Sequence, residues 1–170
     1  MSDEVLEGVG GSCYCRGVQF LISPDAEPFW SAYCHCEGCR RSHAAPIYEA
    51  FYFLKEKFEI TNGSEFLKWY THDESSRESL QRYFCERCGT RVFNLVQGSF
   101  EGEEIETVGT FPSLFNKHSD TTDKKWSPSH HAFCGEAVMN LEQMNDDLPK
   151  HDGDIFFDSL SSYLSGLRHR

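Results

Sequence analysis

Cysteine spacing is the feature of this sequence that most restricts how the chain can fold. Seven of the eight cysteines fall in three clusters: Cys13 with Cys15, then Cys34, Cys36 and Cys39, then Cys85 with Cys88. The chain opens with the acidic stretch "MSDEVLEGVG", which lacks the apolar segment of a secretory signal, so we expect a cytoplasmic protein with reduced thiols. Reduced cysteines at such short spacings are typical of metal or redox sites rather than of a disulfide framework.

The last cluster has the form of a zinc knuckle. In Cys85-Glu-Arg-Cys88-Gly89, the glycine allows backbone N–H groups to turn toward the sulfurs. Because Cys13 and Cys15 form the remaining pair, the simplest partition is a closed four-sulfur zinc site made by these two pairs. Such a structural zinc would join the first strand to the knuckle and contribute about 10–16 kcal/mol of apparent binding free energy.

The middle cluster, "CHCEGC", supplies three sulfurs, and a tetrahedral zinc takes four ligands. One interpretation is that Cys34, Cys36 and Cys39 hold a second zinc whose fourth position receives a small thiol, which would then act as a thiolate nucleophile. The other is that a protein side chain closes the site, the candidates being His35, His43, His130, His131 and Cys134. Cys134 is otherwise expected to be an inert buried thiol. Spacing also allows the last two cysteines of this cluster to pair with the knuckle.

Arginines gather around the cysteines. Six of the nine lie within three residues of a clustered cysteine, and none of the seven lysines does; these are Arg16, Arg40, Arg41, Arg82, Arg87 and Arg91. Guanidinium groups can neutralise a thiolate-rich zinc or bind carboxylates through two parallel hydrogen bonds. Arg40 and Arg41, directly after the middle cluster, are the predicted substrate contacts, and charge neutralisation alone is the alternative.

Composition restricts the classes of partner. With 39% hydrophobic residues and 14 phenylalanines in 170 residues, the chain can bury the core of a globular domain. A net charge of −11 without a basic block argues against binding to nucleic acid. No apolar run approaches the roughly 18 residues of a membrane span, so no membrane association is expected.

The remaining pattern is one of short strands divided by turns, which predicts a mainly β fold of short antiparallel sheets. Strands are expected at 18–22, 29–34, 47–54, 81–96 (interrupted by the knuckle) and 103–111, with a hairpin at Asn62-Gly63 inside 58–70. The segment 37–43 is predicted to be a loop or a single helical turn, and 71–80 and 112–131 polar connections. An amphipathic C-terminal helix is predicted from the helical spacing of Phe156, Leu160, Tyr163, Leu164 and Leu167.

Together these motifs resemble the glutathione-dependent formaldehyde-activating enzyme family, whose relatives include centromere protein V. The resemblance runs through residues 11–20, 34–46, 62–70, 82–94, 109–111 and 128–131, and ends near 146–149. It implies a β-tent-like zinc-binding domain over residues 1–150. The acidic and aromatic extension over 151–170 lies outside the resemblance. The resemblance also implies two zinc ions per chain: a structural one on Cys13, Cys15, Cys85 and Cys88, and a second, catalytic one on Cys34, Cys36 and Cys39.

The resemblance further implies a carbon–sulfur lyase type of chemistry, in which glutathione and formaldehyde combine to S-hydroxymethylglutathione or the reverse reaction occurs. The expected partners are then a small thiol such as glutathione and a carbonyl electrophile. His43 and His131 are candidate acids or bases, and the alternative is that both are ordinary surface histidines. The competing hypothesis for the whole chain is a non-catalytic, zinc-stapled protein-interaction module that uses 112–131 and the C-terminal extension.

Overall fold

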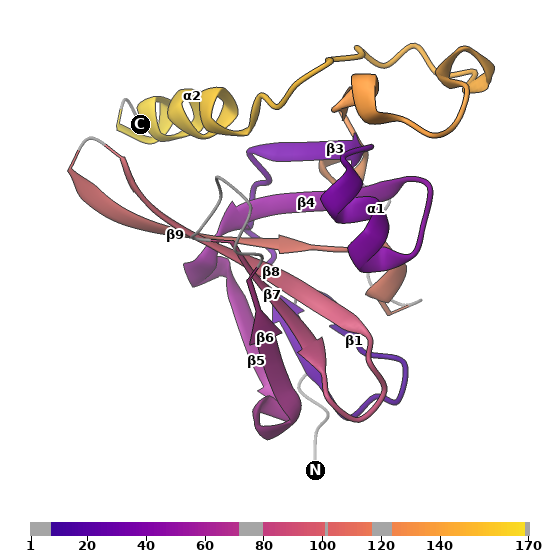
Figure 1. Cartoon of the computed structure of the whole chain (residues 1–170). Coiled ribbons are helices and arrows are strands. Elements are labelled where there is room, and N and C mark those ends of the chain that lie inside the picture. Colours follow the sequence, from indigo (N-terminus) through magenta and orange to yellow (C-terminus); the bar gives the residue numbers. More distant parts are fainter. Residues whose placement is uncertain (1–7, 72–79, 101, 117–123, 169–170) are drawn as a thin grey trace. The chain divides into compact units, whose positions relative to one another are not determined.

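The computed structural model describes residues 8–71, 80–100, 102–116 and 124–168 (Figure 1). Its strands are β1 (Val9–Ser12), β2 (Gln19–Ile22), β3 (Trp30–Cys34), β4 (Tyr48–Leu54), β5 (Phe58–Asn62), β6 (Leu67–Tyr70), β7 (Leu80–Cys85), β8 (Arg91–Phe100), β9 (Glu103–Thr110) and β10 (His130–Ala132). Its α-helices are α1 (Glu37–His43) and α2 (Phe156–Arg168), and short 3-10 turns include η1 (Lys55–Lys57) and η2 (Ser64–Phe66). The prediction of a mainly β fold with a C-terminal helix is confirmed.

The chain forms two compact units, each made of two segments. The first unit contains residues 1–27 and 53–124, and the second contains 28–52 and 125–170. The predicted division into residues 1–150 and 151–170 remains a prediction.

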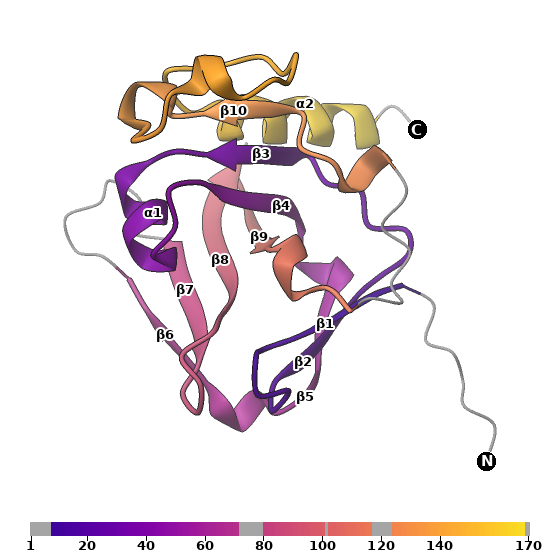
Figure 2. The ribbon, with the colours of Figure 1, turned by 90° about the vertical axis from the view of Figure 1, so that its right-hand side faces the viewer.

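The first unit contains a three-stranded sheet and a four-stranded antiparallel array. The strand orders are β1-β2-β5 and β9-β8-β7-β6, and Figure 2 shows β7 and β8 running side by side. Phe20 of β2 and Phe58 of β5 pack with ring centroids 5.2 Å apart, and Phe58 also packs on Phe93 of β8 at 5.0 Å. The alternation predicted around β2 is therefore real, since Phe20 and Ile22 point into this core.

The hairpin predicted at Asn62-Gly63 is wrong. β5 pairs with β2 and β6 pairs with β7, so the chain changes partner strands at this point instead of folding back on itself. Gly63 has a φ of 74°, and a Cβ atom there would lie 1.9 Å from the carbonyl oxygen of Gly17. The Asn62 side-chain amide donates to the same carbonyl at 3.2 Å. Asn62 and Gly63 form a turn, as these residue types favour. The turn packs against Gly17, in the loop that follows Cys13 and Cys15.

The second unit places a helix against a small sheet. β10 runs parallel to β3, and β3 is antiparallel to β4. α2 lies beside β3 in Figures 1 and 2, and its Phe156 contacts the rings of Phe29, Trp30 and Tyr52 at centroid distances of 5.2, 6.1 and 5.0 Å. With Leu160 also buried, the predicted docked amphipathic helix is confirmed.

The segment 37–43 is a helix rather than the predicted loop or single turn. α1 has seven residues, and the Cys36 sulfur caps its first turn by accepting a hydrogen bond from the Cys39 N–H at 3.3 Å. Ala44 ends it in the left-handed conformation, and its N–H bonds the Arg40 carbonyl. Caps at both ends stabilise the helix and offset the cost of the glycine inside it. The glycine is the reason that the sequence pattern predicts a loop here.

Two predicted polar connections lie partly outside the described residues. Residues 72–79 of the first and 117–123 of the second are not described. The described part of the second contains two short 3-10 turns, at Pro112–Leu114 and Lys124–Trp126.

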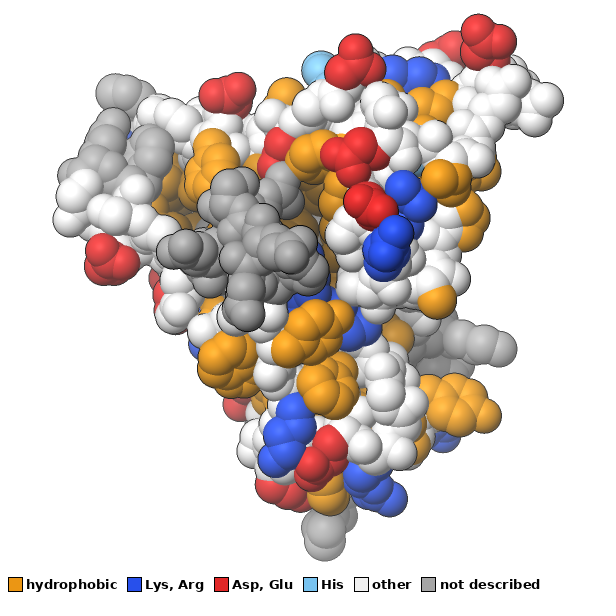
Figure 3. All heavy atoms as spheres, viewed as in Figure 1, with side chains coloured by type: hydrophobic (Ala, Val, Ile, Leu, Met, Phe, Trp, Pro, Cys, Tyr) orange, Lys and Arg blue, Asp and Glu red, His pale blue; other side chains and the backbone are white. Residues whose placement is uncertain are grey.

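Across the described ranges, no helix combines the length and apolarity needed to cross a membrane. On the face seen in Figure 3, basic side chains lie in small groups, several of them beside acidic ones.

Candidate metal centres

Four cysteines of the first unit converge on one point. The sulfurs of Cys13, Cys15, Cys85 and Cys88 all lie within 4.8 Å of one another. Cys13 Sγ and Cys15 Sγ are 3.5 Å apart, and Cys15 Sγ and Cys85 Sγ are 3.9 Å apart. A tetrahedral zinc with Zn–S bonds of about 2.3 Å places its sulfurs about 3.8 Å apart. The four-sulfur group therefore fits a zinc ion in both donor type and spacing.

The two cysteine pairs sit in turns with the same backbone pattern. The Cys13 N–H donates to the Val18 carbonyl at 3.0 Å, and the Cys85 N–H donates to the Thr90 carbonyl at 2.9 Å. In the second turn Gly89 has a φ of 75°, the conformation expected for the glycine after a knuckle. In the first, the Val18 N–H donates to the Cys13 sulfur at 3.3 Å. Local turn geometry thus aims both pairs of sulfurs.

Two thiols of this group, Cys85 and Cys88, differ in how readily they ionise. Burial raises the pKa of Cys85 to about 12. Desolvation acts in the same direction on Cys88, but hydrogen bonds from Thr90 and Cys15 outweigh it and lower the pKa of Cys88 to about 6. The Cys88 sulfur and Thr90 Oγ1 are 3.2 Å apart. Cys88 is therefore largely ionised near neutral pH, whereas Cys85 would release its proton when a metal binds.

Three cysteines of the second unit form a separate group. Cys34 ends β3, Cys36 caps α1 and Cys39 lies in its first turn, and their sulfurs lie within 4.8 Å of one another. Hydrogen bonds shared with Cys36 and Cys39, together with burial, raise the pKa of Cys34. Within the described residues the group has three members. The candidate fourth ligands His35, His43, His130, His131 and Cys134 are outside it. Cys134 is half-buried rather than buried as predicted.

A buried histidine pair includes His35, which lies between Cys34 and Cys36 in the sequence. His35 Nε2 lies 2.9 Å from His131 Nδ1, and both rings are fully buried and stacked. His131 Nε2 lies 3.1 Å from a carboxylate oxygen of Asp146. Burial alone would raise the pKa of Asp146, but hydrogen bonds from His131 and Lys150 lower it overall.

With both imidazole rings neutral, these contacts give each hydrogen bond a direction. The ionised Asp146 only accepts, so His131 Nε2–H donates to it and His131 Nδ1 accepts from His35 Nε2–H. His35 Nδ1 is then an acceptor, and it is buried without a hydrogen-bond partner in the part of the chain that the structure describes. The surface interpretation of His131 is wrong. Asp146 escaped the sequence analysis because no spacing rule links it to a histidine 15 residues earlier.

The other predicted site residues all lie on α1. Arg40 Nε donates to the His35 carbonyl at 2.9 Å. Arg41, whose side chain is 79% exposed, forms an ion pair with Glu37 at 2.8 Å. The His43 ring packs 4.3 Å from that of Tyr48. Each side chain thus has a partner within the second unit, and the substrate and acid–base roles of these residues remain predictions.

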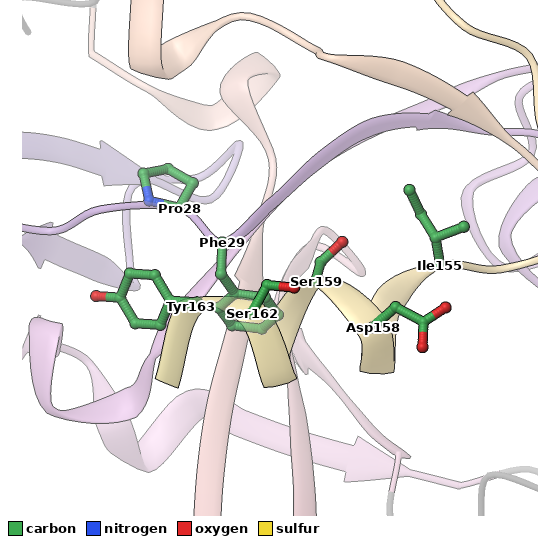
Figure 4. Close-up of a pocket in the computed structure, with 7 residues that line it drawn as sticks. All are labelled: Pro28, Phe29, Ile155, Asp158, Ser159, Ser162 and Tyr163. Atoms are coloured by element: carbon green, nitrogen blue, oxygen red, sulfur yellow. The ribbon is translucent and has the colours of Figure 1, made fainter. Parts of the chain in front are cut away.

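An open hollow elsewhere in the second unit contains none of the predicted site residues. It lies where α2 meets the start of β3 (Figure 4), and its lining residues are Pro28, Phe29, Ile155, Asp158, Ser159, Ser162 and Tyr163. The Phe29 and Tyr163 rings pack against each other there, with centroids 5.9 Å apart. The metal-binding groups are therefore the stronger candidates for a functional site.

One comparison with known proteins, the family match, agrees with the cysteine pattern. The sequence profile of the family described as "Glutathione-dependent formaldehyde-activating enzyme" matches residues 8–136, which include both cysteine groups. The comparison with curated proteins gives no match. A crystal structure of a Rhodobacter sphaeroides protein is similar at 17% identity and a TM-score of 0.45, over 83% of this chain and 98% of that one. From the profile match, the chain belongs to the glutathione-dependent formaldehyde-activating enzyme family.

Proposed function

We propose that the protein is a zinc-dependent enzyme that forms or breaks a carbon–sulfur bond between a small thiol, such as glutathione, and a carbonyl compound. The observation that carries this proposal is the unequal size of the two sulfur groups, four members against three. Four thiolates complete a tetrahedral zinc, whereas three leave one position for a ligand from outside. Family membership supports glutathione as the thiol and formaldehyde as the carbonyl.

The two groups have different roles in this proposal. Cys13, Cys15, Cys85 and Cys88 hold a structural zinc that joins two turns distant in sequence. Cys34, Cys36 and Cys39 hold the reactive zinc. When bound there, zinc would supply the charge that lowers the pKa of a substrate thiol and would keep it as a thiolate.

The reaction requires a proton to move between the substrates. The thiol loses its S–H proton, its sulfur bonds to the carbonyl carbon, and the carbonyl oxygen gains one proton, so the sum is an addition without a redox change. We assign this proton transfer to His35, because its buried Nδ1 has no hydrogen-bond partner within the described ranges. His131 has partners at both nitrogens and is then a positioning residue held by Asp146. His43 is the alternative acid or base.

The test is an exchange measurement by NMR on the zinc-loaded protein. It follows the interconversion of glutathione, formaldehyde and S-hydroxymethylglutathione, and compares Cys36→Ser with Cys134→Ser. Cys134 is the matched control because it lies outside both sulfur groups. Wild type and Cys134→Ser should raise the exchange rate above that of the uncatalysed mixture, and Cys36→Ser should not. Equal rates in the two variants would contradict the proposal and favour the non-catalytic module.

A further inference from the structure

A buried arginine in the first unit has no use in the proposed chemistry. Arg82 of β7 is only 8% exposed, and its Nη1 atom is buried and has no hydrogen-bond partner among the described residues. A guanidinium group stays charged at any pH at which the protein folds. Burying such a charge is costly unless an opposite charge or hydrogen bonds stabilise it. The position of Arg82 therefore calls for an anion.

Strand register shows what surrounds Arg82. It lies directly opposite Tyr70 of β6 on one side and Asn94 of β8 on the other. Asn94 in turn lies opposite Gly109 of β9. Directly opposed residues of antiparallel strands share a face of the sheet. The four residues thus make a polar row across four strands, and the row ends at a residue without a side chain.

A β-bulge brings a second guanidinium to the same row. The register shifts between Tyr83 and Phe84, so that Phe84 lies opposite Arg91. Without this shift Arg91 and Asn94, three residues apart, would point to opposite faces. With it, Arg91 donates through Nη1 to the Tyr70 hydroxyl at 2.9 Å and through Nη2 to the Asn94 side-chain oxygen. Arg91 is 9% exposed.

Two buried guanidinium groups are thus flanked by the same two polar side chains, Tyr70 and Asn94. Like charges on the same face of a sheet repel each other, and an anion between them would convert that repulsion into attraction. An arginine fork matches the two oxygens of a carboxylate or of a phosphate. We propose that Arg82 and Arg91, with Tyr70 and Asn94, form a binding site for a small oxyanion, such as the carboxylate of a small-molecule ligand. Sequence reasoning had placed Arg82 only among the arginines near cysteines.

The test uses the full zinc-loaded chain and a probe that cannot ligate zinc through a thiolate. S-methylglutathione has the carboxylates of glutathione and a capped sulfur. Calorimetry should show that Arg82→Gln binds this probe at least about tenfold more weakly than wild type does, as expected for the loss of a charge-assisted hydrogen-bond pair. Lys55→Gln, which removes one positive charge from η1 of the same unit, should bind like wild type.

A second measurement keeps the test valid if Arg82→Gln does not fold. In the wild-type protein, the arginine Nε–H signals of Arg82 and Arg91 should shift on titration with S-methylglutathione, succinate or inorganic phosphate. They should not shift with glutathione diethyl ester, whose carboxylates are blocked. A larger shift with phosphate than with succinate would name phosphate as the preferred oxyanion.

Two outcomes would overturn the inference. One is equal affinity of Arg82→Gln and Lys55→Gln for S-methylglutathione. The other is that the arginine Nε–H signals do not shift with S-methylglutathione, succinate or phosphate. The inference goes beyond the proposed function. Because the capped probe does not need the three-cysteine group, a failure here would leave the thiol chemistry intact, and a failure of the exchange assay would leave this site intact.

Discussion

At the residue scale, the burial of two histidines in the second unit differs from the sequence-based prediction. His130 and His131 fall in a segment predicted to be a polar connection, yet both are buried. His130 Nδ1 lies 2.9 Å from the Ser129 hydroxyl, and no described residue forms a hydrogen bond with its Nε2. Burial, followed by the nearby His151 and His131, lowers the pKa of His130 to about 4. Such a group ties stability to pH.

His130→Gln should make the folded state less sensitive to acid. The folded-state pKa is about 4 and the unfolded value 6.5, so the unfolded chain binds more protons between these values. The contribution of His130 is complete above pH 6.5 and is lost as pH falls toward 4, by at most about 3 kcal/mol. Urea unfolding of wild type and His130→Gln at pH 7, 5.5 and 4.5 measures it. Identical losses of unfolding free energy in the two proteins would contradict this account.

At the residue scale, the sequence predicted the clustered cysteines and little else of the site. Cysteines that bind one ion lie at short, recognisable spacings, and the structure brings the expected ones together. Arg82, Asn94 and Asp146 follow no such rule. Their environments depend on strand register and on contacts with residues distant in sequence, which local patterns do not contain.

At the scale of elements, strands were predicted better than their partners. The alternation around Phe20 and the helical spacing from Phe156 report which face is buried, and both elements are present. Which strands pair with each other was predicted less well. Asn62-Gly63 favours a turn, but the turn leads from one strand array to the other because Gly63 fits against the Gly17 carbonyl. The sequence pattern does not predict α1 because the segment is short and contains a glycine, and its cap is a cysteine sulfur, which is uncommon in that role.

Gly63→Ala should destabilise the first unit strongly. The new Cβ atom would meet the Gly17 carbonyl oxygen at 1.9 Å, and φ is 74°. Left-handed strain alone costs about 1–3 kcal/mol, and the clash with backbone adds to it. Gly98→Ala in β8 is the matched control, since nothing lies within 4 Å of its Cβ position. Thermal unfolding should show a large loss for Gly63→Ala and a change within about 1 kcal/mol for the control. Equal stability of both variants would argue against the described turn.

At the scale of the whole molecule, the sequence left open how the clustered cysteines are grouped in space. The partition of cysteines into four and three was one of several that the spacing allowed, and the structure shows that partition. Topology was out of reach, because the sequence carries no signal that β10 runs parallel to β3 or that β5 pairs with β2. Strand order and direction depend on how all the elements pack together in the core.

The two metal groups should differ in their importance for folding. Cys88→Ser removes one of four ligands from a group that joins two turns of the first unit, so we expect the variant to lose its structural zinc and its cooperative unfolding transition. Cys36→Ser should keep the fold and one zinc per chain. Metal analysis with circular dichroism on both variants measures this difference. A folded Cys88→Ser variant that contains one zinc would contradict the structural role.

The central claim is that the group of Cys34, Cys36 and Cys39 leaves one zinc position for a substrate thiol. X-ray absorption at the zinc edge, with and without glutathione, tests it most directly on the fully loaded protein. The account predicts seven sulfur ligands over the two ions in the free protein, four in one group and three in the other, and an eighth sulfur when glutathione is added. An unchanged sulfur count, with a histidine nitrogen at the second ion in both samples, would contradict it.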